Sequence, residues 1–295
     1  MKIVLTGSLG HISQPLTQEL VQKGHAVTVI SSKPEKQPAI EALGATAAIG
    51  AVQDVAFLSA AFAGADAVYA MVPPNFRVPE FIAYYRSIGL NYAQAIRRAG
   101  VKRVVHLSSY GADLDQGSGI ILGSHHVEGL LNELAGVAIT HLRPGYFYYN
   151  LYNFVGMIKG AGFMGNNYGG DDRILMVAPA DIAAAAAEEL TTPATGHNVR
   201  YVASDDRTAT EIAQVLGAAI GRPGLTWAIF SDAQTQTGLE KSGMPAQLAA
   251  SLVELGAGIH SGALRQDYDR HKPGAMGKVK LEDFAREFAT RFQQG

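Results

Sequence analysis

The first 145 residues alternate between short apolar runs and longer segments with apolar residues at helical spacing. The short runs have the length and β-branched content of buried strands and lie at residues 2–6, 25–30, 47–50, 67–72, 104–108 and 138–142. The helical patterns lie at residues 14–23, 39–43, 54–62, 81–99 and 123–134. Strands that alternate with helices form parallel sheets covered on both faces. The pattern therefore predicts an α/β fold, a Rossmann-type doubly wound parallel sheet.

The regular alternation of strand and helix patterns ends after Tyr146. Residues 150–176 are rich in Gly, Asn, Tyr and Phe, which is typical of an irregular segment over a ligand site. Further elements are expected as a helix N-capped by Asp181 and running to about Leu190, a strand at 199–202, a helix at 210–220, mixed short elements over 225–275 and an amphipathic helix at 281–292. We predict a Rossmann domain over residues 1–150. Residues 151–295 are predicted to form a small α/β substrate-binding cap packed on it, with some segments returning to the sheet.

Composition narrows the class of protein. The formal net charge of −2 over 295 residues gives no electrostatic reason to expect nucleic acid or an anionic membrane surface as a partner. The absence of cysteine excludes disulfides, thiolate metal sites and a cysteine nucleophile. There is no uncharged apolar stretch of about 18 residues, and no room for a signal peptide before the first predicted strand. We therefore expect a cytoplasmic protein without a membrane span.

A glycine turn follows the first predicted strand and opens the first predicted helix. It reads Gly7-x-x-Gly10-x-x-Ser13, the context that a dinucleotide-binding turn requires. Gly7 permits a tight turn, and Gly10 lets the backbone approach a pyrophosphate at the helix N-terminus, where free N–H groups and the helix dipole favour an anion. Ser13 stands where Gly or Ala is usual. The residues expected to contact the cofactor here are Gly7, Ser8, Leu9, Gly10, His11 and Ile12.

The end of the second predicted strand indicates which dinucleotide is bound. NAD-selective sites place Asp or Glu there to accept the ribose 2′-hydroxyl. This chain has Ser31-Ser32-Lys33 and no acidic residue before Glu35. A hydroxyl and an ammonium group suit a 2′-phosphate, so the sequence favours NADP(H). The alternative is that Lys33 is an ordinary solvated loop lysine.

Further motifs follow the turn in a fixed order. They are the turn Thr6–Ser13, Ala63-Gly64-Ala65-Asp66-Ala67-Val68, Ala99–Ser109, His126-Val127-Glu128, Thr140–Asn150 and Ala180-Asp181-Ile182-Ala183. With these motifs the chain resembles the NmrA-like group of atypical short-chain dehydrogenases/reductases. Within that group it is similar to the type 2 NAD(P)H:quinone oxidoreductases and the triphenylmethane reductases.

The resemblance implies a bound NADP(H) and several of its contacts. Ser32 and Lys33 would lie near the adenosine ribose. Further cofactor contacts implied in this way are Val72 and Pro73 on the nicotinamide-side ribose, Ser108, and Pro144, Tyr146 and Phe147 at the nicotinamide. Ala51 departs from the family, where a Gly-Asp pair is frequent near the adenine.

The chain lacks the usual catalytic pair of short-chain dehydrogenases. A Tyr-x-x-x-Lys is expected on the predicted helix at 123–134, which instead carries His125 and His126. The pair Tyr268 and Lys272 has the spacing but lies far downstream, and we interpret it as chance. Tyr110 and the two histidines are the candidate catalytic residues, with a purely structural role as the alternative for each. Adjacent helical residues point about 100° apart and so cannot readily chelate one ion, and we expect no metal site.

An aromatic segment follows Arg143 and suits a flat apolar pocket. The candidate substrate-pocket residues are Tyr110, Tyr146, Tyr148, Asn150 and Phe163, with core packing as the alternative for about half of the aromatic residues. Phe163, Met164 and Tyr168 are candidates for a lid.

The leading functional hypothesis is an NADPH-dependent reductase that transfers hydride to a quinone-like or other conjugated aromatic electrophile. Hydride transfer requires mainly orientation and a dry pocket from the protein. The alternative, favoured by the missing Tyr/Lys pair, is a non-catalytic NADP(H)-binding redox sensor of the NmrA type. An epimerase or dehydratase of nucleotide sugars fits least, because it also needs the tyrosine. The expected partner is a small aromatic molecule, and a second copy of the chain or a regulatory protein are the macromolecular alternatives.

Overall fold

The computed structural model describes residues 1–294, and internal contacts divide them into two compact units. Unit 1 comprises Met1–Ser109, Gly123–Arg143 and Ile182–Arg200. Unit 2 comprises Tyr110–Leu122, Pro144–Asp181 and the residues from Tyr201 onward. The chain passes between the two compact units several times, whereas the sequence places the main division at residues 150 and 151, with some later segments returning to the sheet.

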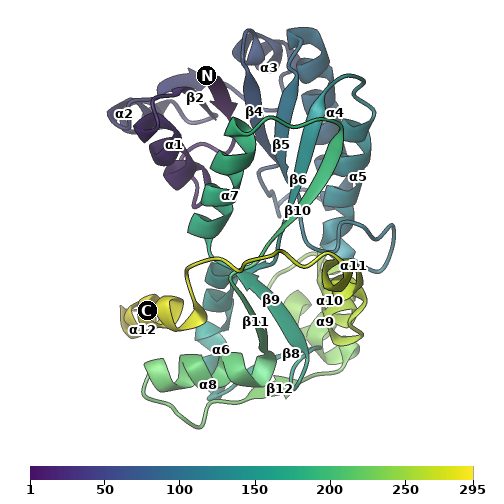
Figure 1. Cartoon of the computed structure of the whole chain (residues 1–295). Coiled ribbons are helices and arrows are strands. Elements are labelled where there is room, and N and C mark those ends of the chain that lie inside the picture. The colour runs from purple at the N-terminus through teal and green to yellow at the C-terminus, as the bar shows by residue number, and fades with distance from the viewer. Residues whose placement is uncertain (295) are drawn as a thin grey trace. The chain divides into compact units, whose positions relative to one another are not determined.

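Unit 1 is built on a seven-stranded sheet with the order β10-β6-β5-β4-β1-β2-β3 (Figure 1). Its strands are β1 (Lys2–Leu5), β2 (Ala26–Ser31), β3 (Thr46–Ile49), β4 (Ala67–Met71), β5 (Arg103–Leu107), β6 (Ala138–Pro144) and β10 (His197–Val202). Strands β1 to β6 pair in parallel with their neighbours. This confirms the predicted Rossmann-type parallel sheet, with the switch in strand order between β1 and β4.

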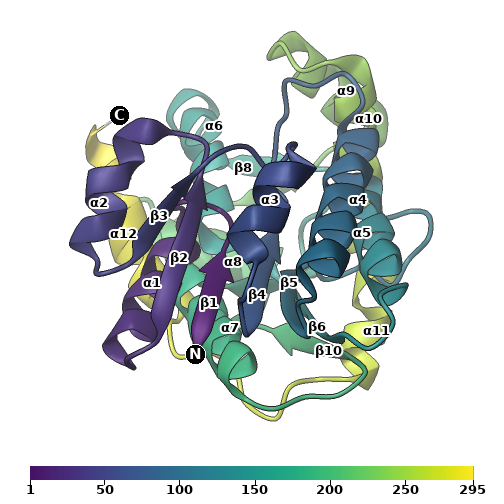
Figure 2. The ribbon, with the colours of Figure 1, turned by 90° about the horizontal axis from the view of Figure 1, so that it is seen from above.

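Helices cover both faces of this sheet, as Figure 2 shows from above. The helices are α1 (Ser13–Gln22), α2 (Gln37–Ala42), α3 (Val55–Phe62), α4 (Phe81–Ala99), α5 (Leu122–Asn132) and α7 (Pro179–Thr191). Helices α3, α4 and α5 lie on one face, and α1 and α7 on the other. Because both faces are covered, β1 is apolar along its buried part, and the side chains from Ile3 to Leu5 are nearly inaccessible to solvent.

Unit 2 contains two small sheets and its own apolar core. Its strands are β7 (Tyr146–Phe147), β8 (Met164–Asn166), β9 (Arg173–Val177), β11 (Asp205–Thr208) and β12 (Trp227–Ile229). Its helices are α6 (Val155–Ala161), α8 (Ala209–Ala219), α9 (Asp232–Lys241), α10 (Ala246–His260), α11 (Gln266–Arg270) and α12 (Leu281–Gln294). The apolar stripe of α12 is buried as its spacing predicts. None of the helices in the described part of the chain has the length and apolar character of a membrane span.

The structure corrects three predictions for this half of the chain. Residues 150–176 are not irregular, because a 3₁₀ segment, α6, β8 and β9 occupy most of them. Asp181 does not N-cap α7. It lies in the first turn, and its carboxylate accepts hydrogen bonds from the Ser204 hydroxyl and the backbone of Lys278 and Val279. The segment 225–275 holds α10, whose 15 residues are not a short element.

A buried layer of polar side chains lies between strands β5 and β6 and helix α5. The imidazoles of His106 and His141 meet edge-on, with 3.0 Å between their Nδ1 atoms, and His141 Nε2 is 3.0 Å from Asn132 Oδ1. Since an amide oxygen only accepts, His141 donates from Nε2, and its Nδ1 accepts from His106. Burial lowers the pKa of His141 to about 4 and holds that of His106 well below its usual value.

An ion pair continues this layer toward the carboxyl end of β5. Arg143 donates to both carboxylate oxygens of Glu128, at 3.0 and 2.7 Å, and the Ser108 hydroxyl donates to the same carboxylate at 2.5 Å. The Arg143 and Glu128 side chains are each 8% exposed. The carboxylate thus joins the end of β5, the end of β6 and α5, so these three elements are held together by one buried group.

The neutral state of His141 makes unit 1 sensitive to acid. Its folded pKa of about 4 lies below the unfolded value near 6.5, so the unfolded chain binds the proton first as the pH falls. We expect the free energy of unfolding to decrease by about 2 kcal/mol between pH 7 and pH 5 from this group alone. Urea unfolding at both pH values measures the decrease.

Two variants separate this effect from general acid sensitivity. His141→Gln should remove about 2 kcal/mol of the decrease, whatever its stability at pH 7. His11→Gln, at an exposed histidine of the same unit that does not contribute to the pKa shift of His141, should retain the whole decrease. An unaltered decrease in His141→Gln would contradict the assignment.

Glu128→Ala should be strongly destabilising, because it leaves the Arg143 guanidinium buried without its counter-charge. We expect the free energy of unfolding to fall by about 3–5 kcal/mol. Glu133→Ala removes an exposed carboxylate just beyond the same helix and should change it by less than about 0.5 kcal/mol. Equal effects in urea unfolding of the two variants would show that the ion pair does not hold these elements.

Candidate functional site

The chain turns sharply from β1 into α1 through residues with unusual backbone angles. Gly7 has φ +94° and Ser8 has φ +53°. A Cβ on Gly7 would lie 2.6 Å from Ser13 Oγ and 3.0 Å from Met71 Cγ, so no other residue fits this position. The Gly10 N–H closes the turn by donating to the Gly7 carbonyl at 3.1 Å.

Hydroxyl groups fix the turn to the sheet. Ser13 Oγ donates to the Thr6 carbonyl at 3.0 Å, and Thr6 Oγ1 accepts from the Met71 N–H at 2.8 Å. The serine at the third position of the motif is therefore accommodated with its hydroxyl bonded to the strand. The result is a rigid connection between β1, β4 and the start of α1.

The beginning of α1 is suited to hold a phosphate group. Ile12 occupies the N-cap position without a side-chain hydrogen bond to the helix, and the first turn contains no acidic residue. The Gln14 N–H already donates to the Gly10 carbonyl at 3.0 Å, and Pro15 has no N–H. An anion here would therefore meet the amides of Ile12 and Ser13 and the positive end of the helix dipole. Gly10 is exposed and has no side chain to block the approach. The cradle fits a pyrophosphate.

Ser31, the last residue of β2, has a structural side chain, and the two residues that follow it have accessible ones. Ser31 is buried, accepts a hydrogen bond from Ser8 Oγ at 2.9 Å and accepts from the Lys33 N–H at 3.2 Å. Ser32 and Lys33 are exposed. Within residues 1–294, Lys33 forms no ion pair, so its ammonium group is available to a ligand beside the turn.

The remaining candidate cofactor residues of unit 1 share the same edge of the sheet. Val72 and Pro73 follow β4, and Ser108 follows β5. Since parallel strands end at one edge and β4 lies between β1 and β5, these residues and the glycine turn are neighbours along it. Val72 is buried, Pro73 is half-buried, and the Ser108 hydroxyl is already bonded to Glu128.

The candidate cofactor residues Pro144, Tyr146 and Phe147 belong to unit 2. Tyr146 and Phe147 form β7, which pairs with β9 opposite Met176 and Val177. Burial raises the pKa of Tyr146 well above its usual value, and a hydrogen bond to Tyr168 adds to this. The cofactor contacts of these residues and of the unit 1 residues stay predictions.

Of the candidate pocket residues, two have buried side chains in unit 2. Tyr148 stacks on Phe284 with centroids 5.4 Å apart, and its hydroxyl donates to Asp205 at 3.1 Å. Tyr110 is also in the core, and burial raises its pKa. Asn150 and Phe163 are half-buried.

The predicted lid is wrong for two of its three residues. Met164 and Tyr168 lie in the core of unit 2, where Tyr168 packs against Trp227 with centroids 5.5 Å apart. Only Phe163 is partly accessible, and it meets Phe230 edge-on.

The two histidines of α5 are partly accessible. Their rings are 5.8 Å apart, and the pKa of His126 is lowered by burial and by the nearby charges of His125 and Arg86. Within the described chain, no three His, Cys, Asp or Glu residues form a group that could hold a metal.

Lys272 Nζ lies 5.9 Å from the centroid of the Tyr268 ring, over its face. This cation–π arrangement supports a structural role for that pair.

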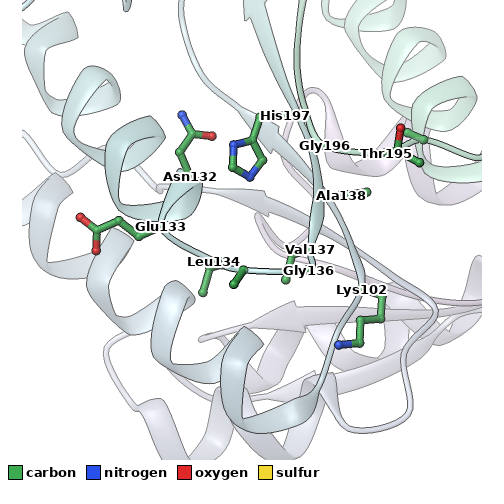
Figure 3. Close-up of a pocket in the computed structure, with 12 residues that line it drawn as sticks. Lys102, Asn132, Glu133, Leu134, Gly136, Val137, Ala138, Thr195, Gly196 and His197 are labelled. Carbon is green, nitrogen blue, oxygen red and sulfur yellow. The ribbon is translucent and has the colours of Figure 1, made fainter.

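A hollow of about 540 Å³ lies at the opposite edge of the unit 1 sheet (Figure 3). It is lined by the connections that precede β6 and β10, among them Asn132, Gly136 and His197. Because it lies at the amino ends of the strands, it is not the space outside the carboxyl ends where ligands of doubly wound sheets bind.

Sequence reasoning missed an aromatic cluster that follows Pro73 at the cofactor edge. Phe76, Phe81 and Tyr85 contact one another in unit 1, with centroids 5.2 and 4.7 Å apart for successive pairs. The available signal was the density of aromatic residues directly after a strand that ends in Pro73-Pro74.

Comparisons with known proteins agree with this architecture. An NAD(P)H azoreductase from Xenophilus azovorans is 29% identical over 259 residues, which cover 86% of this chain and 85% of that protein. The NADPH-dependent quinone oxidoreductase of Escherichia coli, solved with NADPH, has a TM-score of 0.81 at 24% identity and covers 97% of this chain and 99% of its own. The triphenylmethane reductase of Citrobacter sp. has a TM-score of 0.77 at 20% identity, over 99% and 100% of the two chains. At these identities the two structures show the shared fold.

A family model assigns the chain more directly. The model of the NmrA-like family matches residues 1–256, which include the glycine turn, the whole parallel sheet and most of unit 2. The chain therefore belongs to the NmrA-like family.

Proposed function

We propose that the protein is an NADPH-dependent reductase of quinone-like or other conjugated aromatic electrophiles. The observation that carries the proposal is the phosphate cradle at Gly7–Ser13 beside the accessible pair Ser32 and Lys33. The names of the similar proteins, a quinone oxidoreductase, a triphenylmethane reductase and an azoreductase, support the choice of acceptor.

The residues of unit 1 support NADP(H) over NAD(H). The end of β2 offers no carboxylate to accept a ribose 2′-hydroxyl, and Ser31 is occupied by its bond to Ser8. The hydroxyl of Ser32 and the ammonium of Lys33 can instead bind a 2′-phosphate. Bound NADPH would supply the hydride, and the protein would supply orientation and exclusion of water.

The proposal does not require a strong general acid. A quinone-like electrophile accepts the hydride at carbon and a proton at oxygen, whereas an azo group accepts the hydride at one nitrogen and the proton at the other. His125 and His126 are the partly accessible titratable groups on α5 and are the proposed aids to this protonation. The Tyr-x-x-x-Lys pair is absent from α5, which limits the reaction to acceptors that do not need it.

Lys33→Ala should weaken NADPH binding about tenfold through loss of a charge-assisted contact to the 2′-phosphate. NADH binding should change by less than about twofold, because NADH lacks that phosphate. Lys36→Ala, at another exposed lysine three positions along the chain, is the matched control and should leave both affinities unchanged. Isothermal titration with each nucleotide measures the effect. An equal loss for NADPH and NADH would contradict a 2′-phosphate contact.

The unchanged protein should oxidise NADPH in the presence of quinones or azo compounds. The decrease in absorbance at 340 nm measures this oxidation. Turnover at background across such a panel, with tight NADPH binding, would overturn the reductase proposal. That result would favour the redox-sensor alternative.

A further inference from the structure

Phe76 has a large apolar side chain that is exposed to solvent. It lies in unit 1 at the edge of the sheet where β4 ends beside the glycine turn. Its side chain is 50% exposed, whereas most phenylalanine side chains of folded proteins are buried. The ring is nonetheless ordered by a contact, because it lies parallel to Phe81 with 5.2 Å between centroids and 4° between planes. Phe81 is itself buried and contacts Tyr85 at 4.7 Å. We call Phe76, Phe81 and Tyr85 the aromatic stack.

Hydrogen bonds fix α4, the helix that carries Phe81 and Tyr85 of the aromatic stack, to the end of β4. Tyr84, next to Tyr85 in α4, donates its hydroxyl to the Pro73 carbonyl at 3.0 Å. One more anchor comes from Tyr92, whose hydroxyl donates to the Met71 carbonyl at 2.6 Å. The stack is therefore held at a defined place beside Val72 and Pro73, the residues predicted to lie at the nicotinamide-side ribose.

Helix α5 supports the stack from its other side. A Cβ on Gly123 would lie 2.8 Å from Tyr85 Cβ, so the glycine lets the two helices approach closely at this point. His125 and His126 follow two and three residues later on α5. The start of α5, the helix that carries the candidate proton donors, therefore packs closely on Tyr85 of the stack.

We propose that the Phe76 ring forms one wall of the substrate site and determines specificity by stacking on a planar aromatic acceptor. The inference rests on the proposed function and adds to it the class of acceptor that is favoured. An aromatic ring fixed on one side by Phe81 loses little freedom when a second ring stacks on it. Fused two-ring quinones cover more of the Phe76 ring than single-ring quinones do, and they therefore gain more binding free energy from stacking on it.

The test compares 1,4-naphthoquinone with 1,4-benzoquinone at saturating NADPH. In Phe76→Leu we expect KM for the naphthoquinone to rise about three- to tenfold and KM for the benzoquinone less than twofold, with NADPH affinity unchanged. Phe76→Trp keeps an aromatic face and should retain the preference for two rings. Leu90→Ala is the control. It removes a different exposed apolar side chain, which lies on α4, and should change neither KM.

A binding measurement separates this inference from the proposed reductase activity. The chain has one tryptophan, Trp227, which is buried. The Phe76→Trp variant should show saturable quenching of emission by the naphthoquinone beyond that of the unchanged chain. Quenching without turnover would overturn the reductase proposal but support the stacking site. Normal turnover with an unchanged ring preference in Phe76→Leu, or no additional quenching in Phe76→Trp, would overturn the role of Phe76.

Discussion

The close approach of backbone and side chains at Gly7 is the constraint on which the rest of the site depends. Because a Cβ there would collide with Ser13 and Met71, only glycine lets β1 turn directly into α1. That turn brings the N-terminus of α1, with the positive end of its dipole, to the sheet edge where β4 and β5 also end. The pyrophosphate cradle, the Ser32 and Lys33 pair and the aromatic stack all take their positions from this shared edge.

A second constraint keeps that edge in place. The carboxylate of Glu128 receives Ser108 and Arg143, and the neighbouring His106 and His141 remain neutral because they are buried. An apolar layer would pack here too, but it would give β5, β6 and α5 no directional contacts. On α5 the buried Glu128 thus has a structural role, and the partly accessible His125 and His126 are the residues proposed to assist protonation.

The apolar runs and glycines were sufficient to predict the parallel strands β1 to β6, because strands buried on both faces are mainly apolar. They located α4 as residues 81–99 and the turn at Gly7. Contacts between residues that are distant in the sequence could not be predicted from it. Asp181 has the residue type of a helix cap, but its carboxylate accepts hydrogen bonds from the Ser204 hydroxyl and the Val279 N–H. Met164 is buried in a core that segments distant in the chain form together. Phe76 was missed because local sequence does not reveal whether an aromatic ring is covered.

The central claim is that the turn at Gly7–Ser13 holds the pyrophosphate of NADP(H), with Ser32 and Lys33 at the 2′-phosphate. Its most direct test is the change in backbone amide NMR shifts when NADPH is added to the unchanged protein. The amides of residues 8–13 and 32–33 should shift most, and NADH should reproduce the changes at 8–13 more than those at 32–33. NADPH binding that leaves residues 8–13 unshifted would contradict the account.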